Sequence, residues 1–441
     1  MASIDRPAGP AGDPHSTDGT TLACLYVTER NPKAGGVGAL GDYSSVESDV
    51  AHYEVPNIAR FSYTSDVCAL GDPWSATVPD PQGKYRERLR PGSLVEMYLG
   101  NPNVNGGELT QKLKGRILRR RIDVGDAGSV IQLDGADLGH HLKSKVPIWR
   151  SLRGATWKLL AENLIEPSWG FSGVQLGNNI SLRLNNGRRA KEIWLNPTLK
   201  LDPFARIETM PGQSIADLLI LYARRRALMV NVSADGYLQT FAPKYNTPSL
   251  YKLRYFDWSD PQSVENNVER LSLEEIADTI YTDVTVVARS VYTPKDIANA
   301  QATGGTIPSV AGQAGEVHQG DVHAGQSPGS YKDRTVLPYI NRKTLDDGEM
   351  YTAADAFWRA LQVFNRGQFD AWTLKATVRG HWQQQDWWES GTMCDVEIDT
   401  PQLKIKRALF VQRVECTRTD AGDVTRLTLK PPDLLYEIGS R

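Results

Sequence analysis

An internal repeat constrains the fold of this chain more than any other feature, because a duplicated segment implies that two parts of the chain adopt similar structures. Residues 57–63 read NIARFSY, and residues 267–273 read NVERLSL in the same register. A second matching pair is RPGSLVEMYL at 90–99 and ESGTMCDVEI at 389–398. Each member of this second pair has a turn glycine and then alternating apolar positions, which is the pattern of a β-strand. The repeat therefore predicts two related units built from strands.

A pair of predicted hairpins extends the repeat. Residues 116–138 (RILRRRIDVGDAGSVIQLDGADL) and 408–434 (ALFVQRVECTRTDAGDVTRLTLKPPDL) share an Asp-Ala-Gly turn, at 126–128 and 420–422. Glycine supplies the positive φ that such a reversal needs, and the flanking residues alternate between apolar and polar. Short strands at close spacing predict a small antiparallel barrel or sandwich for each copy.

The length of 441 residues is too great for one ordinary core and predicts several domains. We expect a mainly β fold with an α+β insert: two similar small antiparallel β-barrel domains from an internal duplication, plus a middle α+β domain. Residues 1–20, rich in Pro, Gly, Asp and Ser, are expected to form a flexible N-terminal arm. The predicted domains are residues 21–150 for the first β-barrel, 151–256 for the middle α+β domain, and 257–293 together with 370–436 for the second β-barrel.

An insertion at 294–369 interrupts the second copy. Residues 298–330 are rich in glycine and alanine with few large apolar side chains, so they predict an extended loop. A loop of that length often becomes ordered only against a partner. A helix is expected over 352–364, where apolar side chains recur on one face that must pack against another part of the protein.

The middle region has helical patterning at 156–165 and 214–228. Ser214 can cap the second helix, and Asp217 lies in its first turn, where a negative charge is favourable to the helix dipole. Residues 227–241 then read as strand, turn and strand, with Ala-Asp-Gly at the reversal. These elements predict a separate α+β domain.

The charge of the chain is nearly balanced, with 50 basic and 52 acidic residues and a formal net charge of −2. Such a chain has no overall field that would draw it onto nucleic acid or an anionic membrane. The longest apolar run, at 218–223, is too short to cross a bilayer, and the N-terminal residues lack an apolar signal region. We therefore expect synthesis in the cytoplasm and no membrane insertion.

The cysteines lie far apart without a C-x-x-C pair, which favours reduced, buried thiols over a disulfide framework or a zinc site. The 11 tryptophans are unusual, and three of them crowd together at Trp382, Trp387 and Trp388. This cluster predicts either a loop packed on the end of a barrel or a contact surface, with neither favoured. The four cysteines are Cys24, Cys68, Cys394 and Cys416.

The motifs of enzymatic chemistry are weak or absent in the sequence. Gly36, Gly38 and Gly41 complete a G-x-G-x-x-G, but a polar segment precedes it and no apolar helix follows, so a flexible loop is the better interpretation. The P-loop pattern and the G-x-S-x-G motif do not occur. No pair of carboxylates stands out among the acidic residues.

The histidines predict no metal site. His140 and His141 are adjacent, so their side chains diverge on a strand or a helix and suit one metal ion poorly. His318 and His323 lie in the glycine-rich loop, near Glu316 and Asp321, and could bind a metal only if that loop were ordered.

The arginine runs at 119–121 and 224–226 could contact phosphates. The first run is better explained by a strand face exposed to solvent. The second is better explained by arginines whose charge is favourable at the negative C-terminal end of a helix dipole. The N-x-S sequons at Asn179 and Asn231 mean little without a secretion signal. We therefore predict a non-enzymatic structural protein and assign no catalytic, cofactor-binding or metal-binding residue.

The order and spacing of these segments resemble the baseplate hub proteins of contractile-tailed phages. The likeness is to the Mu-like and late-control D group, which is related to the spike-bearing hubs of type VI secretion. It covers residues 25–436, and its individual motifs are short. It is carried by Pro91, Gly92, Gly115, PGQSIADLL at 211–219, VNVSADGYLQTF at 230–241 and NNVERLSLEEIADTIYTDVTVVARS at 266–290.

The resemblance implies a homotrimer in which two tube-type barrels per chain form a pseudo-hexameric ring. Such a ring would join a six-fold tail tube to a three-fold central spike, with the middle domain holding the spike. The implied partners are the spike, tail tube or tube-initiator proteins and baseplate wedge components, while DNA would be met only in transit through the ejection channel. The implied location is the tail baseplate of the virion, after synthesis in the cytoplasm of the host bacterium.

Three alternatives stay open. A receptor- or carbohydrate-binding tail protein would be favoured if the three clustered tryptophans were exposed in a groove. The hub of a DNA-free device, such as a tailocin or a secretion system, has the same sequence features as a phage hub. A hub fused to a peptidoglycan hydrolase would need a further domain with paired acids, and no such stretch stands out.

Overall fold

The structure of the chain is a computed structural model. The expected arm at 1–20, the G-x-G-x-x-G, residues 298–328 of the expected loop, its two histidines and Asn179 lie outside the residues that the structure describes, whereas residues 329–330 of that loop begin a strand. The described residues are 21–30, 50–56, 58–101, 109–125, 128–146, 150–176, 182–183, 189–190, 204–209, 212–225, 228–241, 248–288, 329–347, 353–383 and 386–432.

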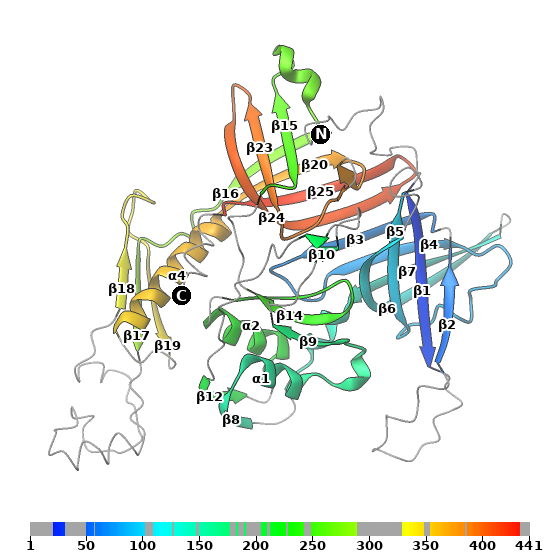
Figure 1. The fold of residues 1–441 in the computed structure, drawn as a ribbon, viewed down its shortest axis with the longest axis horizontal. Helices are drawn as coiled ribbons and strands as arrows, with labels where there is room; N and C mark the ends of the chain where they lie inside the picture. Colours follow the sequence, from blue (N-terminus) through cyan, green and yellow to red (C-terminus); the bar gives the residue numbers. More distant parts are fainter. Residues whose placement is uncertain are drawn as a thin grey trace.

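One large sheet dominates the described residues (Figure 1). It contains 13 strands, in the order β16-β20-β25-β24-β3-β4-β7-β6-β5-β1-β2, with β23 also paired to β24 and β15 paired to β23. The mainly β fold expected from the sequence is therefore confirmed. The strands are β1 Leu22–Arg30, β2 Val50–Val55, β3 Arg60–Asp66, β4 Pro73–Pro79, β5 Leu94–Gly100, β6 Thr110–Gly125, β7 Gly128–Asp137, β15 Tyr251–Phe256, β16 Arg270–Glu275, β20 Trp372–Arg379, β23 Met393–Asp399, β24 Lys404–Thr419 and β25 Gly422–Lys430.

The internal repeat corresponds to two groups of strands with the same order. The first copy runs β3-β4-β7-β6-β5-β1, and the second runs β16-β20-β25-β24-β23-β15. Even single residues match, since Arg60 lies opposite Thr77 in the first copy and Arg270 lies opposite Thr377 in the second. The last pair of strands differs, because β1 is antiparallel to β5 whereas β15 is parallel to β23. The duplication is therefore present in the strand order as well as in the sequence.

The long hairpins of the two copies bend at the same place. The register of β6 against β7 shifts at 117–119, and the register of β24 against β25 shifts at 411–413. Each shift lies at the same distance along the chain from its turn glycine, Gly128 or Gly422, and both glycines have a positive φ. A β-bulge bends its strand and increases the local twist. The two hairpins therefore curve alike.

One matched position shows how the two copies fill a shared hydrophobic core. Trp74 of β4 lies opposite Gly135 of β7, whereas Leu374 of β20 lies opposite Leu429 of β25. A Cβ atom on Gly135 would lie 2.3 Å from the ring of Trp74. The pair of Trp74 with Gly135 and the pair of Leu374 with Leu429 therefore fill similar volumes in the core.

The middle part of the chain has helices, short sheets and its own buried cluster. Both expected helices are present, and the amide of Asp217 donates to Oγ of Ser214 at 3.4 Å, as the cap requires. The predicted strand-turn-strand at 227–241 is also present, and the sequon residue Asn231 lies in it. The elements are η3 Leu138–Lys143, β8 Arg150–Ala155, α1 Trp157–Leu164, η4 Pro167–Trp169, β9 Gly173–Leu176, β10 Leu182–Arg183, β11 Arg189–Ala190, β12 Phe204–Thr209, α2 Ile215–Arg225, β13 Met229–Val232 and β14 Tyr237–Phe241.

The predicted insertion at 294–369 contains a helix that lies against a small sheet (Figure 1). This sheet also includes residues 283–288, which were expected in the second barrel. The helix expected over 352–364 is present and continues to Ala371. Ala360 and Phe364 on its apolar face pack against Val284 and Val286 of the sheet, as the sequence required. No helix among the described residues is long and apolar enough to span a membrane. The remaining elements are β17 Asp283–Ala288, β18 Gly329–Lys332, β19 Arg342–Asp347, α4 Ala353–Ala371, η5 Pro261–Glu265, β21 Trp382–Gln383 and β22 Asp386–Trp387.

Candidate functional site

The two copies join where β3 of the first pairs with β24 of the second. Residues 61–66 run antiparallel to residues 413–418 in six consecutive pairs. The backbone pairing continues at one end, where the amide of Val67 donates to the carbonyl of Gln412 at 3.1 Å. This internal junction makes one continuous sheet out of two repeated units.

Side chains on both faces of the sheet reinforce the internal junction. Tyr63 and Cys416 lie opposite each other and are buried in the common core. At the exposed end, the guanidinium of Arg60 binds the carboxylate of Asp420, with Nε 2.8 Å from Oδ1. The junction is therefore closed by apolar contact inside and by an ion pair outside.

The outer edges of β2 and β15 have no strand paired to them within the described residues, and two further open edges lie on the counterparts of β3 and β24. One is the outer edge of β16, the end of the sheet, where Glu274, Glu275 and Ile276 are exposed. The other is the half of β6 beyond its bulge, which pairs with β7 on one side only. Val124 on this half is 79% exposed. Such edges are ready templates for another strand.

The arginine run at 119–121 lies on this open half of β6. Arg119 and Arg121 are exposed, and Nε of Arg121 bonds Asp123 at 2.8 Å, as a solvated strand face predicts. Arg120 instead donates to the carbonyl of Leu89 at 3.1 Å, which ties the strand to the loop before β5.

The tryptophan cluster is buried. Trp382, Trp387 and Trp388 are only 1%, 4% and 2% exposed. The ring of Tyr251 lies 4.4 Å from that of Trp388, and Nζ of Lys112 lies 5.0 Å from the ring of Trp387. These residues therefore do not line an exposed groove, the arrangement that would have favoured receptor or carbohydrate binding. Their burial agrees with the other alternative, a loop packed on the end of a barrel.

The two adjacent histidines lie in different surroundings. The rings of His140 and His141 lie 6.3 Å apart, and His141 is stacked on Trp169. Burial and the neighbouring Arg116, which donates to Nε2 at 2.9 Å, lower the pKa of His141 to about 4. The ring is therefore neutral at pH 7. No cluster of three or more metal-ligating side chains occurs in the part of the chain that the structure describes.

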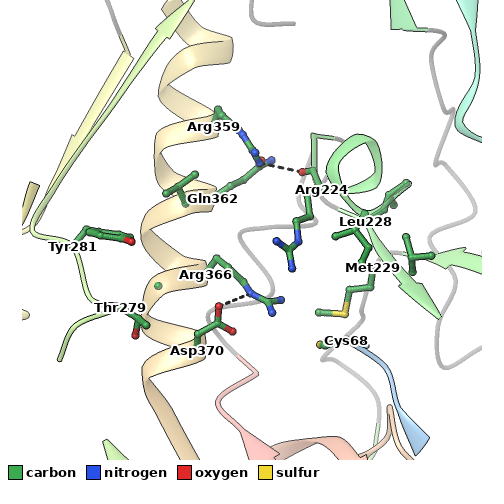
Figure 2. Close-up of a pocket in the computed structure, with 14 residues that line it drawn as sticks. Cys68, Arg224, Leu228, Met229, Thr279, Tyr281, Arg359, Gln362, Arg366 and Asp370 are labelled. Carbon is green, nitrogen blue, oxygen red and sulfur yellow. Dashed lines mark hydrogen bonds and ion pairs between the residues drawn. The ribbon is translucent and has the colours of Figure 1, made fainter. Parts of the chain in front are cut away.

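A cavity of about 280 Å³ lies between α4 and the middle domain (Figure 2). Arg359, Arg366 and Asp370 reach it from α4, Arg224 reaches it from α2, and Cys68 lines its floor. Nε of Arg366 bonds Asp370 at 3.0 Å, and Arg359 donates to the backbone carbonyl of Arg224 at 3.2 Å. Arg224 therefore lies at the contact between the insertion and the middle domain. The sequence predicted only that its charge complements the end of the helix.

The cysteines carry no disulfide among the described residues. Cys24, Cys394 and Cys416 are buried, and Cys68 is half-buried. Burial raises the pKa of Cys68 and of Cys416 to about 11, so both are neutral thiols at pH 7.

Comparison with known proteins identifies the fold. No family model and no curated protein matches the sequence. Among solved structures, the tail protein from Neisseria meningitidis MC58 is similar over 95% of this chain and 98% of its own, with a TM-score of 0.64 and 18% identity. The prophage MuSo2 43 kDa tail protein from Shewanella oneidensis is similar over 93% and 99%, with a TM-score of 0.59 and 13% identity.

A likeness to part of a larger complex accompanies these two. A chain of the Francisella PdpA–VgrG complex is similar over 95% of this chain, with a TM-score of 0.50 and 9% identity, and this chain spans about half of its length (54%). At such low identities the likeness concerns the fold. The chain therefore has the β-rich fold of phage tail proteins, as the resemblance read from the sequence implied.

Proposed function

We propose, from a fold shared with phage tail proteins, that this chain is a structural, non-enzymatic hub of a contractile-tail baseplate. Three copies form a ring with two repeated units from each chain. The ring joins the tail tube to a central spike and lines the channel through which DNA leaves. Tube or tube-initiator proteins and wedge components bind its outer parts, and the assembly is a component of the virion tail.

The observation that carries this proposal is the internal junction between β3 and β24. A duplicated unit whose two copies are already joined edge to edge supplies a third of a six-unit ring. A trimer of such chains has six similar units on one side and three middle domains on the other, which suits a connection between six-fold and three-fold partners.

The test is the mass of the purified full-length chain by light scattering, at several concentrations and with its candidate spike protein. A trimer, or a monomer that forms a 3:3 complex with the spike, supports the proposal. A chain that stays monomeric at all concentrations and does not bind the spike protein overturns the proposal.

A hub of a DNA-free injection device is the second candidate. The likeness to a chain of the Francisella PdpA–VgrG complex favours it, because the similarity extends over 95% of this chain. Particles purified from producing cells would separate the two: packaged DNA supports the phage hub, and tails without DNA or capsid support the second candidate.

A further inference from the structure

We propose that β16 of one chain adds to the open half of β6 in the next chain, residues 119–124, in the register that β3 and β24 use inside one chain. The inference rests on the proposed ring, because it specifies which edges of neighbouring chains meet and residue by residue how they align. The occupant of the open edge of β6 is thus a second copy of this chain.

The internal junction supplies the template for this contact. β16 is the counterpart of β3, and β6 is the counterpart of β24, by strand order and by the matched bulges. Aligning β3 with β16 so that Arg60 matches Arg270, and β24 with β6 so that Gly422 matches Gly128, converts each pair of the internal junction into an expected pair between two chains. The transferred pairs are Arg119 with Ile276, Arg120 with Glu275, Arg121 with Glu274, Ile122 with Leu273, Asp123 with Ser272, and Val124 with Leu271.

The residues that this register brings together are complementary. Arg120 and Arg121 each meet a glutamate, one pair on each face of the extended sheet. On the same face as Arg120, Ile122 meets Leu273 and Val124 meets Leu271. Opposite charges and apolar side chains are the cross-strand pairs that stabilise a sheet. Nothing in the internal junction dictates these identities, because Val414 and Glu415 occupy the positions of the two arginines.

The exposure of the two edges agrees with a missing neighbour. Phe61 and Tyr63 of β3 are 2% and 3% exposed because β24 covers them. Their counterparts on β16, Leu271 and Leu273, are only partly buried. Val124, at 79% exposure, would be covered by the same contact that covers Leu271.

The chemistry also selects one register. A shift by one residue would reverse the faces of every side chain. A shift by two residues in one direction would leave Arg121 opposite Ile276 and place Asp123 opposite Glu274. A shift in the other direction would keep one charge pair, Arg119 with Glu274, and one apolar pair, Ile122 with Leu271, but it would place Arg120 opposite Leu273. The proposed register therefore retains both the apolar pairs and the charge pairs.

The contact uses different surfaces on the two chains, so each chain offers one donor strand and one acceptor edge. Such a heterologous contact closes into a ring when its rotation matches that of the assembly. If the junction between chains copies the internal one, three chains give six alternating junctions of similar geometry.

The register is tested by a disulfide between chains. In the full-length protein, Asp123→Cys combined with Ser272→Cys places two thiols opposite each other, on strands whose Cβ atoms are close enough to bridge. Oxidation is expected to give covalent dimers and trimers on a non-reducing gel. The matched control, Asp123→Cys with Glu274→Cys, is two residues out of register and should give few.

The outcomes separate this inference from the proposed function. Light scattering of the reduced protein reports whether a trimer forms at all. A trimer without the disulfide, or with equal yield from the out-of-register control, overturns the register while leaving the hub proposal intact. A chain that stays monomeric with and without the spike overturns both.

Charge reversal tests the same contact independently. Arg121→Glu or Glu274→Arg alone is expected to weaken self-association about tenfold, and the double variant is expected to restore it to within about threefold. Arg379→Glu, on the exposed face of β20 outside the contact, should leave association unchanged. Melting temperatures identify any variant that fails to fold. A double variant that associates no better than either single variant contradicts the pairing.

Discussion

At the scale of single residues, Asp72 and Asp137 form an unusual pair at the end of β7. Burial raises the pKa of Asp137 to about 7, and burial together with the charge of Asp137 raises the pKa of Asp72 to about 8. The amide of Asp137 donates to the carbonyl of Asp72 at 2.9 Å, which holds the two residues together. The folded protein therefore keeps protons on these carboxyls over a pH range in which the unfolded chain has lost them.

We expect the free energy of unfolding to decrease as pH rises from about 4 to about 8. In this window the unfolded carboxyls are ionised and the folded ones are still protonated, so the folded state binds more protons. Asp137→Asn should weaken this dependence and raise the melting temperature at pH 8 by about 2–4 °C, with little change at pH 5. Thermal melts across this range check the prediction, and an unchanged slope would contradict it.

Gly135 is a second residue whose identity has a clear physical cause. Gly135→Ala would place a Cβ atom 2.3 Å from both the ring of Trp74 and the carbonyl of Arg116. We expect a loss of about 1–3 kcal/mol in the free energy of unfolding, measured by urea titration. Gly125→Ala, where a Cβ would meet nothing within 4 Å, is the control and should change stability little.

At the scale of elements, α4 shows where packing overrides helix propensity. Gly367 lies inside the helix, where glycine costs about 1 kcal/mol relative to alanine. A Cβ at this position would lie 2.3 Å from the carbonyl of Thr279. The glycine therefore allows the helix to approach the segment before β17.

Gly367→Ala is expected to lower the melting temperature despite the better helix propensity of alanine, because α4 would have to move away from Thr279. The comparison variant is Gln368→Ala, which changes propensity on the same helix at a half-buried position and should be nearly neutral. A higher melting temperature for Gly367→Ala would contradict a close contact between α4 and the carbonyl of Thr279.

The elements that the sequence predicted are those with local causes. The cap at Ser214 and the turn glycines Gly128 and Gly422 depend on residues a few positions away, and all three are where the pattern placed them. The pairing of β3 with β24 depends on which distant edges meet, which no local pattern encodes. The burial of Trp388 likewise depends on Tyr251, far away in the sequence.

At the scale of the whole molecule, the proposed contact between chains combines exposed charges with apolar pairs. Salt screens exposed charge pairs but not apolar burial. We therefore expect self-association to weaken by less than about tenfold between 50 and 500 mM NaCl, measured by light scattering. Association that strengthens steadily with salt would mean that the charged edges do not face each other.

The internal junction also has a consequence in time. Asp66 and Gln412, which hydrogen-bond across it, are 346 residues apart. At a synthesis rate of roughly 10 residues per second, β3 waits on the order of half a minute for its partner strand. During that interval the unpaired edge of β3, which later buries Phe61 and Tyr63, can pair with β24 of another chain that is already complete. A domain-swapped dimer is therefore the misassembled product that this topology most readily forms.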